Sequence, residues 1–254
     1  MPQPKASTVW ITGASSGLGS ALAEVYAARG ATLGLVGRRE HALSTLAARL
    51  GARHRWYVAD VRCGATMNAA ADRFLADQGA PDLIIGNAGI SIGTDTRMND
   101  SAAFEEVLAT NVVGLFNTFH PFLRHLSAGA RLVGIASVAG YRGLPGAGAY
   151  SASKAAAMAY LESLRVELAS DGIAVTTICP GYIHTPMTVA NPYPMPFIIS
   201  AMDAAGRIAR VIDSGTSYAV IPWQMAIVAR LLRVLPNGIF DRALRDVPRK
   251  PRRG

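Results

Sequence analysis

The stretch "TVWITGASSGLGSALAEVYAARG", residues 8–30, decides the fold. An apolar run leads into a turn with three glycines, and a segment of helical periodicity follows directly. Gly13 permits the sharp turn, Gly17 lets backbone amides approach a phosphate, and Gly19 allows the helix to pack closely on the strand. Glycine-rich turns follow many strands, but here a strand and an amphipathic helix flank the turn. The stretch therefore predicts a phosphate-binding turn whose helix directs its positive end at the ligand.

Seven apolar runs of strand length alternate along the chain with longer stretches of helical periodicity. Their hydrophobicity is continuous rather than alternating, which is typical of strands that are covered on both faces. We therefore expect an α/β fold, a doubly wound parallel sheet of about seven strands with helices on both faces. The runs are residues 8–12, 32–37, 54–59, 82–86, 130–137, 173–180 and 217–223.

A chain of 254 residues is long enough for one such domain. We expect residues 1–222 to form it and residues 223–254 to add a helical and basic C-terminal extension to it. Residues 179–197 contain five prolines, which exclude a regular element there. They predict a long loop near the C-terminal edge of the sheet, where ligands bind in such folds.

The formal net charge of +8 is distributed unevenly along the chain. Residues 230–254 hold eight Arg or Lys and two Asp, so this segment carries +6 and the remaining chain carries only +2. A globally basic surface is therefore not expected, which argues against a nucleic-acid-binding protein.

Several features bear on the cellular compartment. Cys63 and Cys179 are far apart and form no CxxC pair, so we expect reduced, buried thiols. His120 and His125 lack zinc-ligand spacing, so no metal site is expected. No apolar signal segment precedes the first strand, and no run reaches the roughly 18 apolar residues of a membrane-spanning helix. These features predict a cytoplasmic protein that is soluble or peripheral at a membrane.

The second apolar run leads into Gly37, Arg38 and Arg39. At this point of a dinucleotide fold, an acidic side chain accepts a hydrogen bond from the adenosine ribose and repels a 2′-phosphate. Gly37 stands where we would look for that acid, and a neighbouring guanidinium can make charge-assisted bonds to phosphate. The pattern favours NADP over NAD. The alternative is a pair of arginines at a solvated helix start.

The stretch "YSASKAA", residues 150–156, places a phenol four residues before an amine. On a helix, Tyr150 and Lys154 would lie on one face, where the ammonium can stabilise a tyrosinate. By itself such a pair is more often just an exposed pair, so the rest of the chain must decide its role.

Taken together and in this order, the motifs resemble those of the short-chain dehydrogenase/reductase family over residues 8 to about 187. "TGASSGLG" matches the family's TGxxxGxG cofactor loop, and Tyr150 with Lys154 matches YxxxK. "GNAG" stands where the family usually has NNAG, and this departure at Gly86 concerns strand packing more than chemistry. Besides Arg38, Arg39, Tyr150 and Lys154, the cofactor contacts implied are Gly13, Ser15, Ser16, Gly17, Leu18, Gly19, Asp60, Val61, Asn87, Ala88, Gly89, Pro180, Gly181, Ile183 and Thr185.

The resemblance also implies catalytic roles for Asn111, Ser137, Tyr150 and Lys154. Tyr150 would protonate a ketone oxygen, or take the proton in the reverse direction, while Lys154 would lower its pKa and hold the nicotinamide ribose. Ser137 would orient the substrate carbonyl; the alternative is a serine that satisfies a strand end. Asn111 would open the helix of residues 101–119 to hold a water that relays protons with Lys154; the alternative is an exposed asparagine.

The implied function is NADP(H)-dependent hydride transfer between the nicotinamide and a ketone or secondary alcohol. Apolar residues after Thr185 favour a hydrophobic or acyl-chain substrate over a sugar, although they could instead pack the loop on the domain. A catalytically idle NADP-binding regulator or scaffold is the alternative, and the complete set of four catalytic residues favours the enzyme. The apolar residues are Met187, Val189, Tyr193, Met195, Phe197, Ile198 and Ile199.

The family commonly ends soon after its seventh strand, whereas this chain continues through residues 223–254. The extension puts the family's usual tetramer in question, and we expect a homodimer through the helices around Asn111 and Tyr150. Residues 223–235 combine an aromatic residue, aliphatic residues and two arginines, so they could contact an anionic membrane surface. The favoured alternative is that this helix covers the sheet edge or a dimer contact and that the basic end is disordered, because packing needs no partner.

Overall fold

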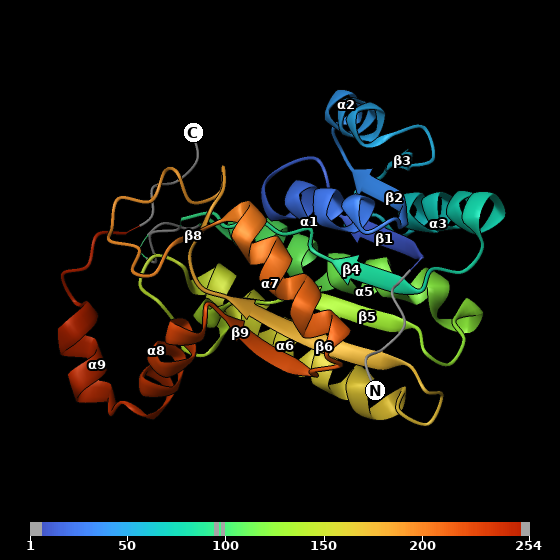
Figure 1. Cartoon of the computed structure of the whole chain (residues 1–254). Coiled ribbons are helices and arrows are strands. Elements are labelled where there is room, and N and C mark those ends of the chain that lie inside the picture. The colour runs from blue at the N-terminus through green and yellow to red at the C-terminus, as the bar shows by residue number, and fades with distance from the viewer. Residues whose placement is uncertain (1–6, 94–96, 98–99, 250–254) are drawn as a thin grey trace.

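A parallel sheet of seven strands forms the centre of the computed structural model, which describes residues 7–93, 97 and 100–249 (Figure 1). The strand order is β3-β2-β1-β4-β5-β6-β9, and every neighbouring pair is parallel. Each of the seven apolar runs contains one strand, so the predicted doubly wound sheet is confirmed. The strands are β1 Thr8–Thr12, β2 Thr32–Gly37, β3 Arg55–Val58, β4 Leu83–Gly86, β5 Arg131–Ile135, β6 Ala174–Pro180 and β9 Tyr218–Ile221.

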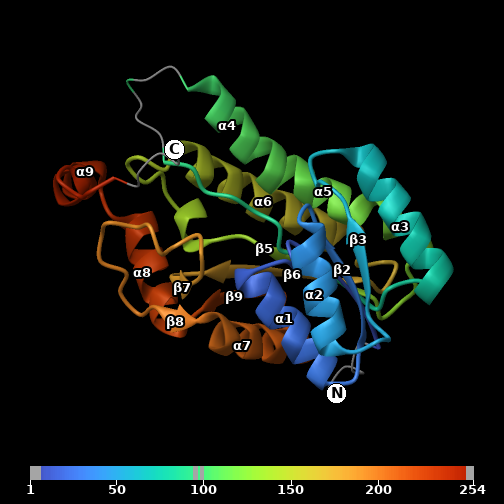
Figure 2. The ribbon, with the colours of Figure 1, turned by 90° about the horizontal axis from the view of Figure 1, so that it is seen from above.

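Helices cover both faces of the sheet, as Figure 2 shows. One face carries α1 Gly17–Ala28, α2 Glu40–Leu50 and α7 Ala201–Asp213, and the other carries α3 Gly64–Gln78, α4 Ser101–Leu108, α5 Gly114–Phe119 and α6 Gly148–Glu167.

Successive strand residues enter different cores, because side chains alternate across a strand. Val9 and Ile11 of β1 join the core under α1 and α7, whereas Trp10 joins the core under α3 and α6. Both cores are apolar, which accounts for the continuous hydrophobicity of the strands.

Gly86, where the sequence departs from the family's usual asparagine, lies at the end of β4. A Cβ atom there would lie 2.4 Å from Cδ1 of Leu115 and 3.1 Å from Cζ of Phe119, so α5 packs directly on this strand. The residue therefore affects the packing of a helix on the sheet, as the sequence predicts.

The proline-rich segment of residues 179–197 lies mostly in turns and irregular structure, as expected, but it is not wholly irregular. Within it, β7 Ile183–His184 pairs with β8 Ile199–Ser200 just beyond the segment. The expectation that no regular element forms here is therefore wrong for two residues. They lie between Pro180 and Pro186, so both backbone amides are available for a ladder.

The predicted helix of residues 101–119 is interrupted at Asn111. The segment Ala109–Val113 forms a π-helical turn between α4 and α5. Such turns widen the helix and are frequent at functional sites. The expectation that Asn111 lies where the helix opens is confirmed.

Two helices follow the last strand of the sheet, α8 Trp223–Val234 and α9 Asn237–Leu244. The sequence predicts the helix that became α8, but after Pro236 and Gly238 it predicts only a basic tail. Pro236 instead stands at the N-cap of α9, where a missing amide proton costs no helical hydrogen bond.

The corner between α8 and α9 is held by Arg142, from the segment that follows β5. Its guanidinium donates to the carbonyl oxygens of Leu232, at 2.8 Å, and Leu235, and to Oδ1 of Asn237 at 2.6 Å. The same group lies 3.9 Å from the ring centre of Phe240, which is buried. One distant arginine thus caps α8 and fixes α9, an arrangement that no local pattern indicates.

Two further observations bear on the expectations about compartment. Cys179 is buried, but Cys63 is exposed at the N-cap of α3, so the expectation that both thiols are buried is wrong for Cys63. Among the described residues, no helix is both long and apolar enough to cross a membrane.

Candidate active site

A cavity of about 520 Å³ opens at the carboxyl edge of the sheet. Two of the predicted site residues do not line it: Gly19 lies beneath the glycine-rich turn and Asn111 lies behind the cavity wall. The predicted residues that line the cavity are Gly13, Ser15, Ser16, Gly17, Leu18, Arg38, Arg39, Asp60, Val61, Asn87, Ala88, Gly89, Ser137, Tyr150, Lys154, Pro180, Gly181, Ile183 and Thr185.

The glycine-rich turn requires glycine at three positions, and at Gly17 the reason is a φ of +59°. Gly13 has φ +68°, and a Cβ there would lie 2.8 Å from Cα of Ala88. At Gly19 a Cβ would lie 2.2 Å from the carbonyl oxygen of Gly13, so only glycine lets α1 approach the turn this closely. The turn is thereby pressed against the segment that follows β4.

The start of α1 faces the cavity. Ser16 is its N-cap, makes no side-chain capping hydrogen bond, and no acidic residue occupies the first turn. The first amide groups of a helix have no intrahelical partner and carry partial positive charge. This end of the cavity therefore suits an anionic ligand.

Asn87 joins the two segments that border this end of the cavity. Its Nδ2 donates to the carbonyl oxygens of Thr12 at 3.0 Å and Gly13 at 3.3 Å. The amide of Asn87 in turn donates to Oγ1 of Thr12 at 3.2 Å. The carboxyl ends of β1 and β4 are thus held in one geometry.

The two arginines after β2 have different surroundings. Arg39 donates to Oγ of Ser15 at 2.9 Å and to Oγ of Ser16 at 2.7 Å, which ties the glycine-rich turn to the start of α2. Arg38 is exposed at the rim of the cavity. A Cβ at Gly37 would meet Oγ of Ser15 at an ordinary 3.5 Å.

Asp60, one of the predicted cofactor contacts, is held by a nearby arginine. Arg62 donates to the Asp60 carboxylate through its side chain, at distances down to 2.7 Å, and through its amide at 3.0 Å. The Arg62 side-chain hydrogen bonds are the first cause of the lowered pKa of Asp60. The carboxylate therefore stays ionised and fixed in orientation at the cavity wall.

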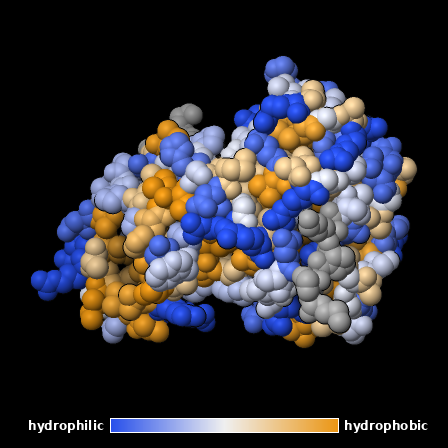
Figure 3. Space-filling model, in the orientation of Figure 1, coloured by the Kyte–Doolittle hydropathy of each residue, from blue (hydrophilic) through white to orange (hydrophobic). Residues whose placement is uncertain are grey.

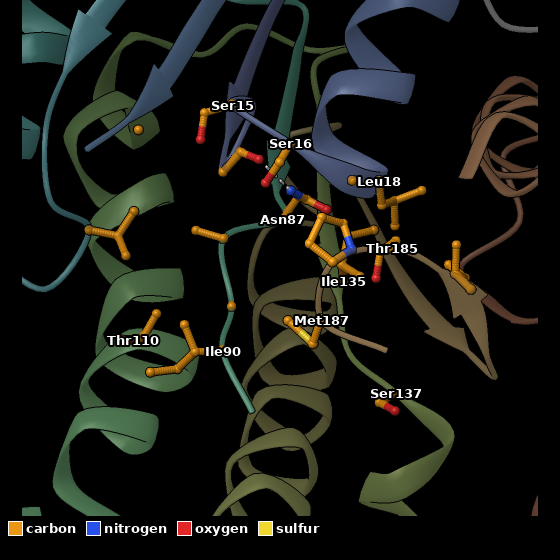
Figure 4. Close-up of a pocket in the computed structure, with 18 of the residues that line it drawn as sticks. Ser15, Ser16, Leu18, Asn87, Ile90, Thr110, Ile135, Ser137, Thr185 and Met187 are labelled. Atoms are coloured by element: carbon orange, nitrogen blue, oxygen red, sulfur yellow. Dashed lines mark hydrogen bonds between the residues drawn. The ribbon is translucent and has the colours of Figure 1, made fainter. Parts of the chain in front are cut away.

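Ser137, Tyr150 and Lys154 lie together at the end of the cavity opposite the turn. Figure 4 shows Ser15 and Ser16 at one end, Ser137 at the other, and Met187 between them. The Ser137 side chain lies close enough to the Tyr150 phenol to act on its pKa. Nζ of Lys154 lies 5.8 Å from the ring centre of Tyr150 and donates to the carbonyl oxygen of Ile135 at 2.7 Å.

The pKa values of Tyr150 and Lys154 are set first by burial. Burial raises the pKa of Tyr150, while the Ser137 side chain acts in the lowering direction. Burial also lowers the pKa of Lys154 from 10.5 to about 8. The groups of the protein alone therefore do not lower the pKa of Tyr150 as the sequence predicts, because the loss of water outweighs the effect of Ser137.

Asn111 contacts the site indirectly, through hydrogen bonds to a segment that lines the cavity. Its Oδ1 accepts from the amide of Ile90 at 2.8 Å, and its Nδ2 donates to the carbonyl oxygen of Ile90 and to Oγ of Ser153, both at 2.9 Å. Gly89 lies between Asn111 and Lys154, since a Cβ there would be 3.2 Å from Oδ1 and 3.4 Å from Nζ. Asn111 is buried rather than exposed, and its role in a water relay stays a prediction.

Several lining residues were missed by sequence reasoning, and each lies within three positions of a predicted one. Thr188 is the clearest case: it accepts from the amide of Thr185 at 3.1 Å and donates to the carbonyl oxygen of Ile183 at 2.6 Å, so it shapes the loop over the turn. Its proximity to the recognised "PGYIHTP" segment is the signal that could have found it. The other missed residues are Ala59, Ile90, Thr110, Ile135, Ala136 and Pro186.

The lowered pKa of Lys154 predicts a dependence of stability on pH. Lys154 is 5% exposed, and its pKa falls from 10.5 to about 8, so between these pH values the unfolded chain binds more protons. The free energy of unfolding then rises with pH across this window, by about 3 kcal/mol for such a shift. The variant Lys154→Met lacks this contribution.

Urea denaturation of both proteins at several pH values checks this expectation. The stability of the wild type relative to Lys154→Met should increase from about pH 8 to about pH 10.5, the two pKa values of the buried amine. A difference that does not change across the window would contradict a buried, neutralised Lys154.

Comparisons with known proteins give a consistent picture. The family model described as short chain dehydrogenase matches residues 7–193. An uncharacterized oxidoreductase of Myxococcus xanthus is 38% identical over 246 residues, which cover 94% of this chain and 96% of that protein. A sulfoacetaldehyde reductase of Chromohalobacter salexigens is 36% identical over 189 residues, covering 72% of this chain and 75% of the relative.

Solved structures agree with the fold. A short chain dehydrogenase/reductase from Burkholderia phymatum, in complex with NAD, superposes with a TM-score of 0.83 at 26% identity and covers 96% of this chain and 97% of its own. An alcohol dehydrogenase from Thermococcus sibiricus has a TM-score of 0.78 at 22% identity, covering 85% of this chain and 95% of its own, and shows the fold alone.

Proposed function

The chain belongs to the short-chain dehydrogenase/reductase family of oxidoreductases, and we propose that it transfers a hydride between NADP(H) and a hydrophobic ketone or secondary alcohol. The observation that carries the proposal is the placement of Ser137, Tyr150 and Lys154 at one end of a cavity whose other end is the glycine-rich turn. The turn would hold the pyrophosphate, and Ser137, Tyr150 and Lys154 would lie beside the nicotinamide half of the dinucleotide.

The residues of the cavity fit a nicotinamide dinucleotide. The close approach at Gly13 and the uncapped start of α1 suit the pyrophosphate, and the relative from Burkholderia phymatum binds NAD. Asp60 and Val61 would border the adenine, and Lys154 would hold the nicotinamide ribose. Pro180, Gly181, Ile183 and Thr185 would cover the nicotinamide half.

The chemistry divides between the cofactor and the chain's own residues. When bound, the nicotinamide supplies or accepts the hydride. Tyr150 donates the proton to the carbonyl oxygen, or removes it from the alcohol, and Ser137 orients that oxygen through its hydroxyl. Lys154, charged below a pKa of about 8, stabilises the phenolate that remains. Asn111 holds the Gly89–Ile90 segment beside Lys154 and would position the water that returns the proton.

The preference for NADP rests on the end of β2. No carboxylate stands at Gly37 to accept a hydrogen bond from the ribose or to repel a 2′-phosphate, and Arg38 is exposed at the rim of the cavity. Arg39 holds Ser15 and Ser16, so its guanidinium lies close to the same end of the cavity. A 2′-phosphate could therefore contact the guanidinium groups of two consecutive arginines.

The substrate class is inferred from the residues beside the phenol. Met187 lines the cavity, and Tyr193 lies close enough to Tyr150 for their charges to interact. The rings of Tyr182 and Tyr193 are 6.3 Å apart, and burial is the first cause that raises the pKa of Tyr193 to about 12. A thioether in the cavity wall and a nearby pair of aromatic rings favour an apolar ketone over a sugar.

A panel of carbonyl compounds tests the function. We expect NADPH oxidation with aryl ketones, aliphatic ketones or 3-oxoacyl thioesters, at a kcat/KM of about 10⁴–10⁸ M⁻¹s⁻¹ for a good substrate. Keto sugars of similar size serve as the polar comparison. NADPH binding without turnover across the whole panel would instead support the alternative, a catalytically idle NADP-binding regulator.

A homodimer through α4, α5 and α6 is also proposed. Phe104, Val113 and Phe116 are large apolar side chains that remain exposed on this side of the chain, next to the segment that carries Asn111. Contiguous exposed apolar residues commonly mark an interface. Light scattering should give the mass of a dimer for the wild type and a monomer for Phe104→Ser/Phe116→Ser; a monomeric wild type would rule this interface out.

A further inference from the structure

Helix α8 carries an apolar stripe on its outer face. The side chains of Trp223, Ile227, Leu231 and Val234 are 64%, 51%, 58% and 75% exposed. They follow one another at spacings of four, four and three residues, so they lie along one side of the helix. Ile239 of α9 is also exposed, and Figure 3 shows hydrophobic residues gathered over this region at the lower left.

The stripe is a fixed surface of the fold rather than a frayed end. The inner face of α8 is buried through Met225 and Ala229, and Met225 packs against Gly181 in the cavity wall. Arg142 fixes the other end of α8 by bonding the carbonyl oxygen of Leu232 and the side chain of Asn237. The inner face thus covers the end of the sheet, as one of the two interpretations of the sequence expects, while the described residues leave the outer face exposed.

Exposed cations lie on α8 and along the chain that follows it. Arg230 lies three residues after Ile227 and four before Val234, so it projects on the same side of α8, and it is exposed. Also exposed in the described residues are Arg233, Arg242, Arg245 and Arg249, against the carboxylates of Asp241 and Asp246. The sequence adds Lys250, Arg252 and Arg253.

We propose that this face, the α8 stripe with its arginines, binds the surface of an anionic lipid membrane. A helix with an apolar side and flanking cations lies in the plane of a bilayer, where the apolar side enters the acyl boundary and the cations contact anionic headgroups. With 12 residues, α8 is too short to cross the bilayer.

Charge decides between a membrane and a second copy of the chain. A two-fold interface would place this face against itself, so the arginines that flank one stripe would meet those of the other. Like charges across an interface disfavour association, whereas an anionic surface neutralises all of them together. A lipid surface therefore fits both the apolar stripe and the arginines beside it better than a second copy of the chain does.

Vesicle sedimentation with the full-length protein tests the proposal. We expect binding to vesicles of phosphatidylcholine with phosphatidylglycerol, little binding to phosphatidylcholine alone, and release at high salt. Ile227→Ser/Leu231→Ser should weaken binding about tenfold or more, and Arg230→Gln/Arg233→Gln about twenty- to thirtyfold, at about fivefold per cation. The matched control is Arg53→Gln/Val58→Ser, an exposed arginine and an exposed valine at the edge of the sheet opposite β9, which should bind as the wild type does.

Tryptophan emission gives a second readout. Of the three tryptophans, Trp10 is buried and Trp56 is half-buried, so Trp223 is the one exposed to water. Anionic vesicles should shift the emission to shorter wavelength, and Trp223→Phe should abolish the shift. Turnover of a soluble substrate should be unchanged in the stripe variants, so a failure of this proposal is distinguishable from a failure of the proposed reaction.

Three results would overturn the proposal. The protein could remain in the supernatant with anionic vesicles at low salt. It could bind anionic vesicles, but with the same affinity in the wild type, the stripe variants and the control variant. Or light scattering could show a self-association that Ile227→Ser/Leu231→Ser abolishes, which would assign the stripe to a second copy.

Discussion

Replacing Tyr150 by phenylalanine should reduce turnover by about 10²–10⁴-fold, the usual contribution of a general acid. The change removes the hydroxyl whose pKa the neighbouring Ser137 affects and retains the ring beside Lys154. Because only the proton donor is lost, NADPH should bind with nearly unchanged affinity. Steady-state kinetics on the best ketone of the panel, with NADPH titration by fluorescence, measure both quantities.

Tyr160 provides the matched control for this substitution. It lies on the same helix, is partly buried, and does not line the cavity, so Tyr160→Phe makes the same chemical change away from the site. Its turnover should stay near that of the wild type. If Tyr150→Phe kept more than about a tenth of the wild-type kcat, less than about 1.4 kcal/mol of barrier stabilisation would be lost and the assignment of the acid would be wrong.

The double variant Gly37→Asp/Arg38→Ala should reverse the cofactor preference. It supplies a carboxylate for the ribose hydroxyls and removes a guanidinium from the 2′-phosphate. A charged hydrogen bond contributes about 1.5–3 kcal/mol, so the ratio of kcat/KM for NADPH to that for NADH should fall about 10²-fold or more. The site can accept the aspartate, because a Cβ at Gly37 meets its nearest neighbours, Ser15 and Leu43, no closer than 3.5 Å.

Single variants separate the contributions of the neighbouring arginines. Arg38→Ala should weaken NADPH binding and leave NADH binding unchanged, whereas Arg39→Ala should also loosen Ser15 and Ser16 and so affect both cofactors. Arg49→Ala, at the far end of α2, is the control for a lost surface charge. Equal affinity of the wild type for NADH and NADPH would refute the preference itself.

Much of the fold follows from the order of residues along the chain. Buried parallel strands need apolar side chains on both faces, so the runs that became β1 to β6 and β9 are recognisable without any tertiary contact. The glycine-rich turn is equally local, because the geometry at Gly13 and Gly19 admits no side chain. The pairing of Tyr150 with Lys154 follows from helical spacing alone.

What the sequence alone determined about this protein is therefore its strands, its glycine-rich turn and the order of its motifs, since each depends on neighbours within a few residues. The tertiary structure decided the rest. Burial by distant segments lowers the pKa of Lys154 and raises that of Tyr150. Asn111 accepts a hydrogen bond from the amide of Ile90, which lies in a loop distant along the chain. Arg142 reaches helices about ninety residues later and so creates the corner that leaves the α8 stripe exposed. Desolvation and long-range hydrogen bonds depend on which segments pack together, and local patterns do not contain that information.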